Sequence, residues 1–147
     1  VPWPRNERSP VAGLKTTSYA ENVVALAHAT ERGAGEALFA TLVGDLCEGT
    51  GSNVFVGLDG RLVTPPLGSG CLAGITRDLV IETSDAVETD VSMADFARAD
   101  EAFLTSSTRD VQPISTVDGR ALPHCPGPLT RAATDAFTAL MALTLDP

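Results

Sequence analysis

A single lysine, Lys15, stands out among the residues that could carry out chemistry. The ten basic residues of the chain are nine arginines and this one lysine. A lysine amine can lose its proton and attack a carbonyl carbon, whereas an arginine guanidinium stays protonated. The pattern therefore indicates that Lys15 is a nucleophilic amine. A surface lysine retained by chance is the alternative.

Glu48 is the second candidate for chemistry. It ends a predicted strand over residues 46–48 and opens the Gly-rich turn 48–53, with the sequence EGTGSN. A carboxylate in a buried strand needs a cation or a hydrogen-bond donor beside it. We therefore expect such a partner next to Glu48, although a turn of this composition is also typical of a purely structural turn.

Two further segments could bind an anion. Gly-rich residues 68–74 lead into a predicted helix that begins at Ile75. The free N–H groups and the positive end of a helix start attract anions. Residues 105–109, with the sequence TSSTR, place several hydroxyl groups just after a predicted strand. Taken alone, each segment could equally be an ordinary helix start or polar loop.

Histidine and cysteine give no evidence of a metal site. His28 and His124 have no companion at a metal-ligand spacing, so structural roles are expected for both. Cys47, Cys71 and Cys125 are odd in number and widely spaced, which fits neither a disulfide framework nor a zinc motif. A reducing cytoplasm is the simplest setting for such a chain, and no Ser-His-Asp arrangement is evident.

Turn signals and periodicity predict one mixed α/β domain with more strands than helices. A capping box, Ser18-x-x-Glu21, is expected to open a helix that stops at Gly33, so Lys15 would lie on an extended segment just ahead of it. Further helices are predicted over 75–83, 92–99 and 129–143. Strands are predicted over 36–43, 46–48, 53–58, 61–64, 101–105 and 111–117, with hairpin turns at 59–60 and 118–119.

Composition restricts the class of protein. The chain has 147 residues, of which 44% are hydrophobic and 20% charged, as in a single globular domain. A net charge of −9 argues against binding to nucleic acid or to an anionic membrane surface. No apolar run approaches the roughly 20 residues that span a bilayer. The start at Val1 lacks a signal-peptide layout, and we expect an upstream part of the protein to be missing.

Six ordered motifs together resemble the class IV aminotransferases, which include branched-chain aminotransferases, D-amino-acid aminotransferases and 4-amino-4-deoxychorismate lyases. The resemblance covers nearly the whole chain. The motifs are GLKTTSY at 13–19, EGTGSNVF at 48–55, LVTPP at 62–66, LAGITR at 72–77, ADEAFLTSST at 99–108 and PISTVDG at 113–119.

The resemblance implies a role for each matching residue. Lys15 matches the lysine that holds pyridoxal 5'-phosphate covalently and later moves a proton. Glu48 matches the carboxylate beside the pyridine nitrogen, which keeps the ring an electron sink. The remaining matches are Ile75, Thr76 and Ser107 at the phosphate, Leu72 on one ring face, Tyr19 at the phenolic oxygen and Thr108 facing the substrate.

The position of Tyr19 separates members of the family. Branched-chain aminotransferases place their tyrosine five residues after the lysine, whereas here it is four residues after Lys15, as in some aminodeoxychorismate lyases. Gly13-Leu14-Lys15 is also similar to a lyase, and the whole chain most resembles actinobacterial members of that group. The resemblance thus implies conversion of 4-amino-4-deoxychorismate to 4-aminobenzoate and pyruvate. A transaminase of branched-chain or D-amino acids is the alternative.

Family members are about twice as long as this chain. The resemblance implies that residues 1–147 form their larger C-terminal domain, a mixed-sheet pseudo-barrel with outer helices. The N-terminal domain, which in the family supplies a phosphate-binding arginine and part of the substrate pocket, is expected to be absent. A catalytically inactive fragment is therefore a third reading, and the full-length enzyme is expected to be a homodimer that binds a small amino substrate.

Overall fold

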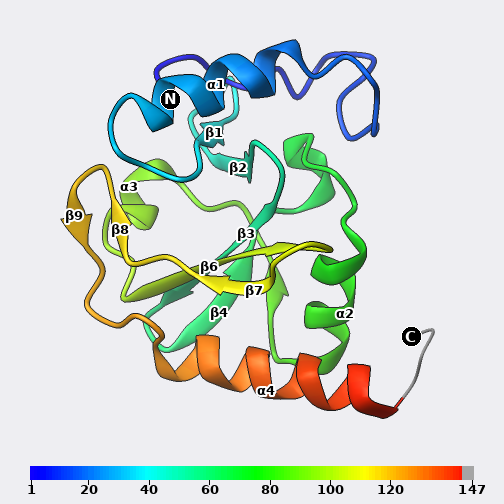
Figure 1. Cartoon of the computed structure of the whole chain (residues 1–147), viewed down its shortest axis with the longest axis vertical. Helices are drawn as coiled ribbons and strands as arrows, with labels where there is room; N and C mark the ends of the chain where they lie inside the picture. Colours follow the sequence, from blue (N-terminus) through cyan, green and yellow to red (C-terminus); the bar gives the residue numbers. More distant parts are fainter. Residues whose placement is uncertain (144–147) are drawn as a thin grey trace.

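The Asp59-Gly60 turn organises the central sheet. Both residues have positive φ, 50° and 75°, as the two-residue turn between β3 (Asn53–Leu58) and β4 (Arg61–Thr64) requires. The computed structural model, which describes residues 1–143, extends this hairpin into a five-stranded sheet of order β5-β4-β3-β6-β7 (Figure 1). The added strands are β5 (Val87–Glu88), β6 (Glu101–Ser106) and β7 (Asp110–Pro113). Within this sheet, β4 and β5 pair in parallel and the other neighbouring strands pair antiparallel.

Four short strands form two smaller ladders. β1 (Leu38–Ala40) pairs antiparallel with β2 (Leu46–Gly49), with a register irregularity between them. β8 (Thr116–Val117) pairs with β9 (Arg120–Ala121) through a second two-residue turn. Both small ladders are antiparallel, so the β4–β5 pair is what makes the strand pairing mixed.

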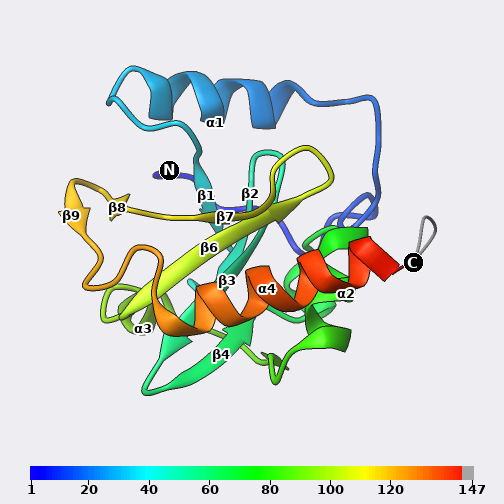
Figure 2. The same ribbon diagram turned by 60° about the horizontal axis from the view of Figure 1, so that its bottom comes forward.

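Helices α2 (Ile75–Thr83) and α4 (Pro128–Leu143) cover one face of the central sheet (Figure 2). Their apolar side chains pack on the stacked rings of Phe55 and Phe103, whose centroids are 4.9 Å apart. The opposite face packs on the short helix α3 (Met93–Phe96) and on β2. Burying both faces explains why β3 and β6 are almost continuously apolar.

A separate layer holds the N-terminal part of the chain. Helix α1 (Ala20–Thr30) lies at the top of Figure 1 and packs its small residues, Ala25 and Ala29, against Phe39 and Cys47 of the β1–β2 ladder. The segment ahead of α1 passes the short 3-10 helix η1 (Leu67–Ser69), where Gly13 N donates to Gly70 O at 3.0 Å. This contact positions the segment that carries Lys15.

The expected α/β fold with a mixed sheet is confirmed. Three elements begin and end at the predicted residues: the strands 53–58 and 61–64 and the helix 75–83. The predicted capping box is wrong, because α1 begins after Tyr19 without a side-chain cap and Glu21 pairs with Arg5 instead. The strand predicted over 36–43 is reduced to β1, and that over 111–117 is split into β7 and β8. Within residues 1–143, no helix is long and apolar enough to cross a membrane.

Candidate functional site

A cavity of about 600 Å³ opens between the N-terminal segment, the β2–β3 turn, the start of α2 and the β6–β7 turn. A volume of this size suits a small molecule. All eight residues singled out from the sequence line it, although they come from four separate stretches of chain. They are Lys15, Tyr19, Glu48, Leu72, Ile75, Thr76, Ser107 and Thr108.

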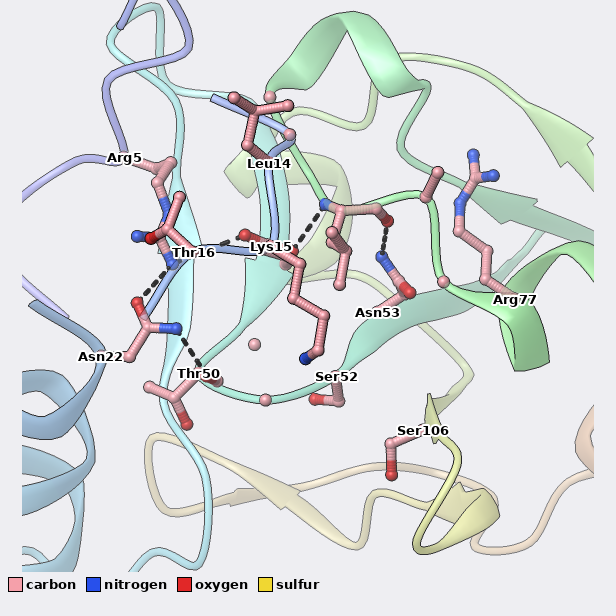
Figure 3. A pocket seen from close by; sticks show the side chains of 18 of the residues that line it. Arg5, Leu14, Lys15, Thr16, Asn22, Thr50, Ser52, Asn53, Arg77 and Ser106 are labelled. Carbon is pink, nitrogen blue, oxygen red and sulfur yellow. Dashed lines mark hydrogen bonds and ion pairs between the residues drawn. The ribbon is translucent and has the colours of Figure 1, made fainter. Parts of the chain in front are cut away.

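Lys15 projects into this cavity from the segment ahead of α1. Its side chain points toward Ser52, and Ser106 lies across the cavity from it (Figure 3). The residue is exposed, and its Nζ lies 6.0 Å from the centroid of the Tyr19 ring, which is itself 41% exposed. The amine is therefore open to a ligand that enters the cavity.

Glu48 lies at the end of β2 with only 13% of its side chain exposed. Its Oε2 accepts a hydrogen bond from Leu72 N at 2.9 Å, and its Oε1 lies 3.5 Å from Arg5 Nη2. Burial raises the pKa of Glu48, while the Leu72 amide and the Arg5 guanidinium lower it and the Glu21 carboxylate raises it. The expected partners of a buried carboxylate are thus present.

The start of α2 provides unpaired donors at another wall of the cavity. The first bond of the helix runs from Asp78 N to Gly74 O, so the N–H groups of Ile75 and Thr76 have no intrahelical acceptor. No side chain caps this end. Gly74 permits the arrangement, because a Cβ there would lie 2.2 Å from Asn53 Oδ1.

The β6–β7 turn brings hydroxyl groups to the same cavity. Ser107 and Thr108 are exposed on the turn, and Ser106 Oγ lies 3.4 Å from Thr108 Oγ1. Thr105 is only 1% exposed, and its Oγ1 has no hydrogen-bond partner. Thr105 pairs across the ladder with Asn53, whose side chain bonds Leu72 O ahead of α2, so its hydroxyl belongs to the α2 side of the cavity.

Glu36 connects two walls of the cavity from behind. Its Oε1 accepts hydrogen bonds from the backbone N–H (2.9 Å) and the hydroxyl of Thr50 on the β2–β3 turn. Its Oε2 pairs with Arg109 Nη2 at 2.5 Å, at the end of the β6–β7 turn. One carboxylate therefore fixes both turns relative to each other.

Arg77 lines the cavity but its guanidinium faces away from it (Figure 3). The side chain is fully buried and is bound by Asp78, by Pro65 O at 3.0 Å and by Glu88. The start of α2 therefore offers an anion backbone N–H groups and hydroxyls, and not this guanidinium.

The lining fits pyridoxal phosphate. An accessible amine at Lys15, a buried carboxyl at Glu48 and a helix start with unpaired N–H groups are the three functions that its aldehyde, ring nitrogen and phosphate would require. The orphaned hydroxyl of Thr105 adds a buried donor without a protein acceptor.

The cysteines and histidines take no part in this arrangement. Cys47 and Cys71 are buried, and burial raises the pKa of the Cys47 thiol to about 12, so it stays protonated. His28 packs edge-on against Trp3. Within residues 1–143, no group of three or more His, Cys, Asp or Glu side chains could hold a metal ion.

Several residues of the site escape prediction from the sequence. Arg5, Asn22 and Glu36 make contacts across 14 to 73 positions of the chain and belong to no local pattern. Asn53 lies inside the motif 48–55, but that motif does not indicate that its side chain donates to Leu72 O ahead of α2. Thr105 belongs to the hydroxyl segment 105–109, but its burial and its unpaired hydroxyl are visible only in the structure.

Comparison with known proteins supplies the family context. The sequence model described as "Amino-transferase class IV" matches residues 1–117. A branched-chain-amino-acid aminotransferase of Pseudomonas aeruginosa is 34% identical over 131 residues, which cover 85% of this chain and 42% of that protein.

Solved structures give the same picture. Branched-chain amino acid aminotransferase from Thermobaculum terrenum, in its PLP-form, superposes with a TM-score of 0.88 at 35% identity, covering 95% of this chain and 48% of that one. A Legionella pneumophila protein provisionally named 4-amino-4-deoxychorismate lyase superposes with a TM-score of 0.86 at 26% identity, covering 97% of this chain and 53% of that one. The chain thus spans about half the length of these relatives.

Proposed function

The chain belongs to the class IV aminotransferase family, and we propose that it is the cofactor-binding domain of a pyridoxal-phosphate enzyme that acts on an amino-acid-like substrate. The observation that carries the proposal is the convergence of Lys15, Glu48 and the uncapped start of α2 on one cavity. The cofactor is pyridoxal 5'-phosphate, which the T. terrenum relative contains in its PLP-form.

In this proposal Lys15 would hold the cofactor through its amine. When bound, the cofactor draws electrons away from the substrate carbon that carries the amino group. The amine of Lys15, which lines the cavity, would also act as the general base that takes a proton from the substrate.

The other lining residues orient the cofactor. Glu48 holds a proton at the ring nitrogen, and the N–H groups of Ile75 and Thr76 bind the phosphate together with Ser107. The last three roles follow from the family resemblance: Leu72 on a ring face, Tyr19 at the phenolic oxygen and Thr108 toward the substrate. All three residues line the cavity, which is consistent with these roles.

For the reaction, we propose elimination of pyruvate from 4-amino-4-deoxychorismate to leave 4-aminobenzoate. Tyr19 supports this choice, because it follows Lys15 by four residues and not by five. The structural likeness to the L. pneumophila protein is consistent with it.

Transamination of a branched-chain amino acid is the second candidate. The P. aeruginosa and T. terrenum relatives, both named branched-chain aminotransferases, are more similar in sequence than the L. pneumophila protein. The same lining residues would serve either reaction, since both begin with loss of a proton from the substrate.

The two reactions differ in what happens without a keto acid. An eliminating enzyme releases pyruvate and 4-aminobenzoate over many turnovers. A transaminase instead converts its cofactor once to the amine form and then stops. We expect the full-length enzyme to release both products from 4-amino-4-deoxychorismate with no keto acid present. Stoichiometric conversion of the cofactor by Leu, Ile or Val would contradict the elimination and establish the second candidate.

We also propose that the chain works as the C-terminal domain of a longer, dimeric protein. Its length, about half that of the relatives, supports this assignment. An N-terminal domain would cover the open side of the cavity, where Lys15, Tyr19 and Ile75 are exposed. The fragment alone would then lack part of the site.

A further inference from the structure

Arg5 lies at the wall of the cavity and is held there by contacts at both ends of the residue. Its backbone N–H donates to Ala40 O at 2.7 Å, which joins the N-terminal segment to β1. Its side chain is only 15% exposed, and its Cζ lies 4.0 Å from the centroid of the Phe39 ring. A guanidinium held over an aromatic face in this way has little freedom to move.

The guanidinium is shared between two carboxylates. Nη1 pairs with Glu21, whereas Nη2 donates to Asn22 Oδ1 at 2.9 Å and lies 3.5 Å from Glu48 Oε1. The second oxygen of Glu48 is already occupied by Leu72 N. Figure 3 shows Arg5 approaching from the side of the cavity opposite Asn53.

We propose that Arg5 is a positioning residue that keeps Glu48 ionised, so that a proton shared between Glu48 and the cofactor resides on the ring nitrogen. The inference rests on the proposed role of Glu48. In a buried pair that shares one proton, a cation on the far side of the carboxylate favours the arrangement in which the carboxylate is charged. Arg5 would thus act on the ring nitrogen through Glu48.

The other groups around Glu48 do not supply this charge. Glu21, from α1, acts in the opposite sense and raises the pKa of Glu48. The neighbouring thiols of Cys47 and Cys71 have raised pKa values because of burial and are uncharged at neutral pH. Lys15 and Tyr19 line the cavity itself, on the side that a bound cofactor would occupy.

The first test needs no cofactor. The side-chain carboxyl of Glu48 is followed by 13C NMR as pH is varied, its signal being assigned by its absence in Glu48→Gln. We expect the midpoint to rise by about one pH unit or more in Arg5→Gln, a tenfold change in ionisation, and to fall in Glu21→Gln. Arg5→Lys, which keeps a cation over Phe39, should retain most of the effect.

Opposite shifts in Arg5→Gln and Glu21→Gln distinguish charge from packing, because loss of packing alone does not move the midpoint in opposite directions. Arg5→Met, which keeps an unbranched chain on Phe39, replaces Arg5→Gln if the latter loses its fold in a thermal melt. An unchanged or lower Glu48 midpoint in the folded neutral variant would overturn the inference.

The second test reports on the cofactor directly. The chain is loaded with pyridoxal phosphate labelled with 15N in the ring, and the 15N shift shows whether that nitrogen carries a proton. We expect the shift to move from the protonated toward the unprotonated value in Arg5→Gln and further in Glu48→Gln. A response to Glu48→Gln but not to Arg5→Gln would refute the inference alone. No response to either variant, with the first test positive, would refute the proposed role of Glu48.

Discussion

Glu48 lies in a buried position that disfavours its ionised form. Burial raises its pKa, and only the Leu72 amide and the Arg5 guanidinium favour the carboxylate. Such a group costs stability in the empty protein, and the cost is explained if the carboxylate is needed by a ligand. Glu48 should therefore affect activity and stability in separate, measurable ways.

Replacing Glu48 by Gln should leave a protein that binds pyridoxal phosphate but turns over slowly. The amide cannot hold a proton at the ring nitrogen as a carboxylate does. Losing one charge-assisted hydrogen bond costs roughly 1.5–3 kcal/mol, which is about a ten- to hundredfold loss of kcat in the full-length enzyme. Near-normal turnover would return Glu48 to a structural role.

The same variant should change the pH dependence of stability in the cofactor-free chain. Because the folded-state pKa of Glu48 is raised, the folded chain binds the proton more readily than the unfolded chain does. The stabilisation from this proton is present at low pH and is lost as pH rises through the raised value. Denaturant titrations from about pH 4 upward should show the parent losing unfolding free energy relative to Glu48→Gln. A difference that is constant with pH would contradict the prediction.

The sequence identifies site residues that lie in local motifs better than those that reach the site through long-range contacts. Lys15 and Glu48 lie in local motifs, so their types and spacing could be recognised. Arg5 and Glu36 contact the site through side chains that reach distant parts of the chain, and their positions depend on how the layers pack. The sequence alone could not therefore predict the ion pairs that position the lining.

At the scale of elements, helix starts at α2 and α4 differ in how their N–H groups are satisfied. The start of α4 is capped by Glu101, a fully buried carboxylate of β6 that accepts from Leu129 N at 3.0 Å and from Thr130 N and Oγ1 at 2.7 Å. The start of α2 has no such cap. The contrast is consistent with α4 as a structural helix and α2 as a helix that receives an anion.

Gly127 should be intolerant of a side chain, because a Cβ there would lie 2.3–2.5 Å from the carboxyl group of Glu101. We expect Gly127→Ala to lower the unfolding free energy by about 2 kcal/mol or more, since Glu101 must move and leave buried donors unpaired. Gly35→Ala is the matched control, because nothing lies within 4 Å of a Cβ there, and its change should stay within about 0.5 kcal/mol. Equal changes in the two variants, measured by urea unfolding, would rule out this role for Glu101.

Elements with strong local sequence signals can be predicted with their exact first and last residues. The turn at 59–60 fixes β3 and β4, and the glycine ahead of Ile75 marks the start of α2. The prediction is wrong at α1, where Tyr19 and not Ser18 precedes the helix, no side chain caps it, and Glu21 pairs with Arg5. It also failed at 36–43, where Glu36 turns its side chain to Thr50 and only β1 remains in the ladder.

At the scale of the whole molecule, apolar side chains remain uncovered around the cavity and on α1. These side chains, all at least 40% exposed, are Val11, Leu14, Tyr19, Val23, Val24, Leu26 and Ile75. An apolar surface of this kind in a globular protein is usually an interface. It agrees with the proposal that the chain works next to a further domain.

The isolated chain should bind pyridoxal phosphate more weakly than the full-length enzyme and turn over little or not at all. The guanidinium of Arg77 is held away from the cavity, so the phosphate would be bound in an open site by N–H groups and hydroxyls. One missing charge-assisted contact weakens binding by about 1.5–3 kcal/mol, or roughly ten- to a hundredfold in Kd. Equal Kd and kcat for the two proteins would show that the site is complete within residues 1–147.

The most direct test of the account is to locate the amine that holds the cofactor. The chain is loaded with pyridoxal phosphate, reduced with borohydride, digested and mapped by mass spectrometry. Lys15 is the only lysine, and its side chain enters the cavity beside Ser52 (Figure 3). We predict a pyridoxyl group on Lys15 and none in Lys15→Ala. A pyridoxyl group on the N-terminal amine of Val1 instead, at equal yield in both proteins, would contradict the assignment on which the proposed chemistry depends.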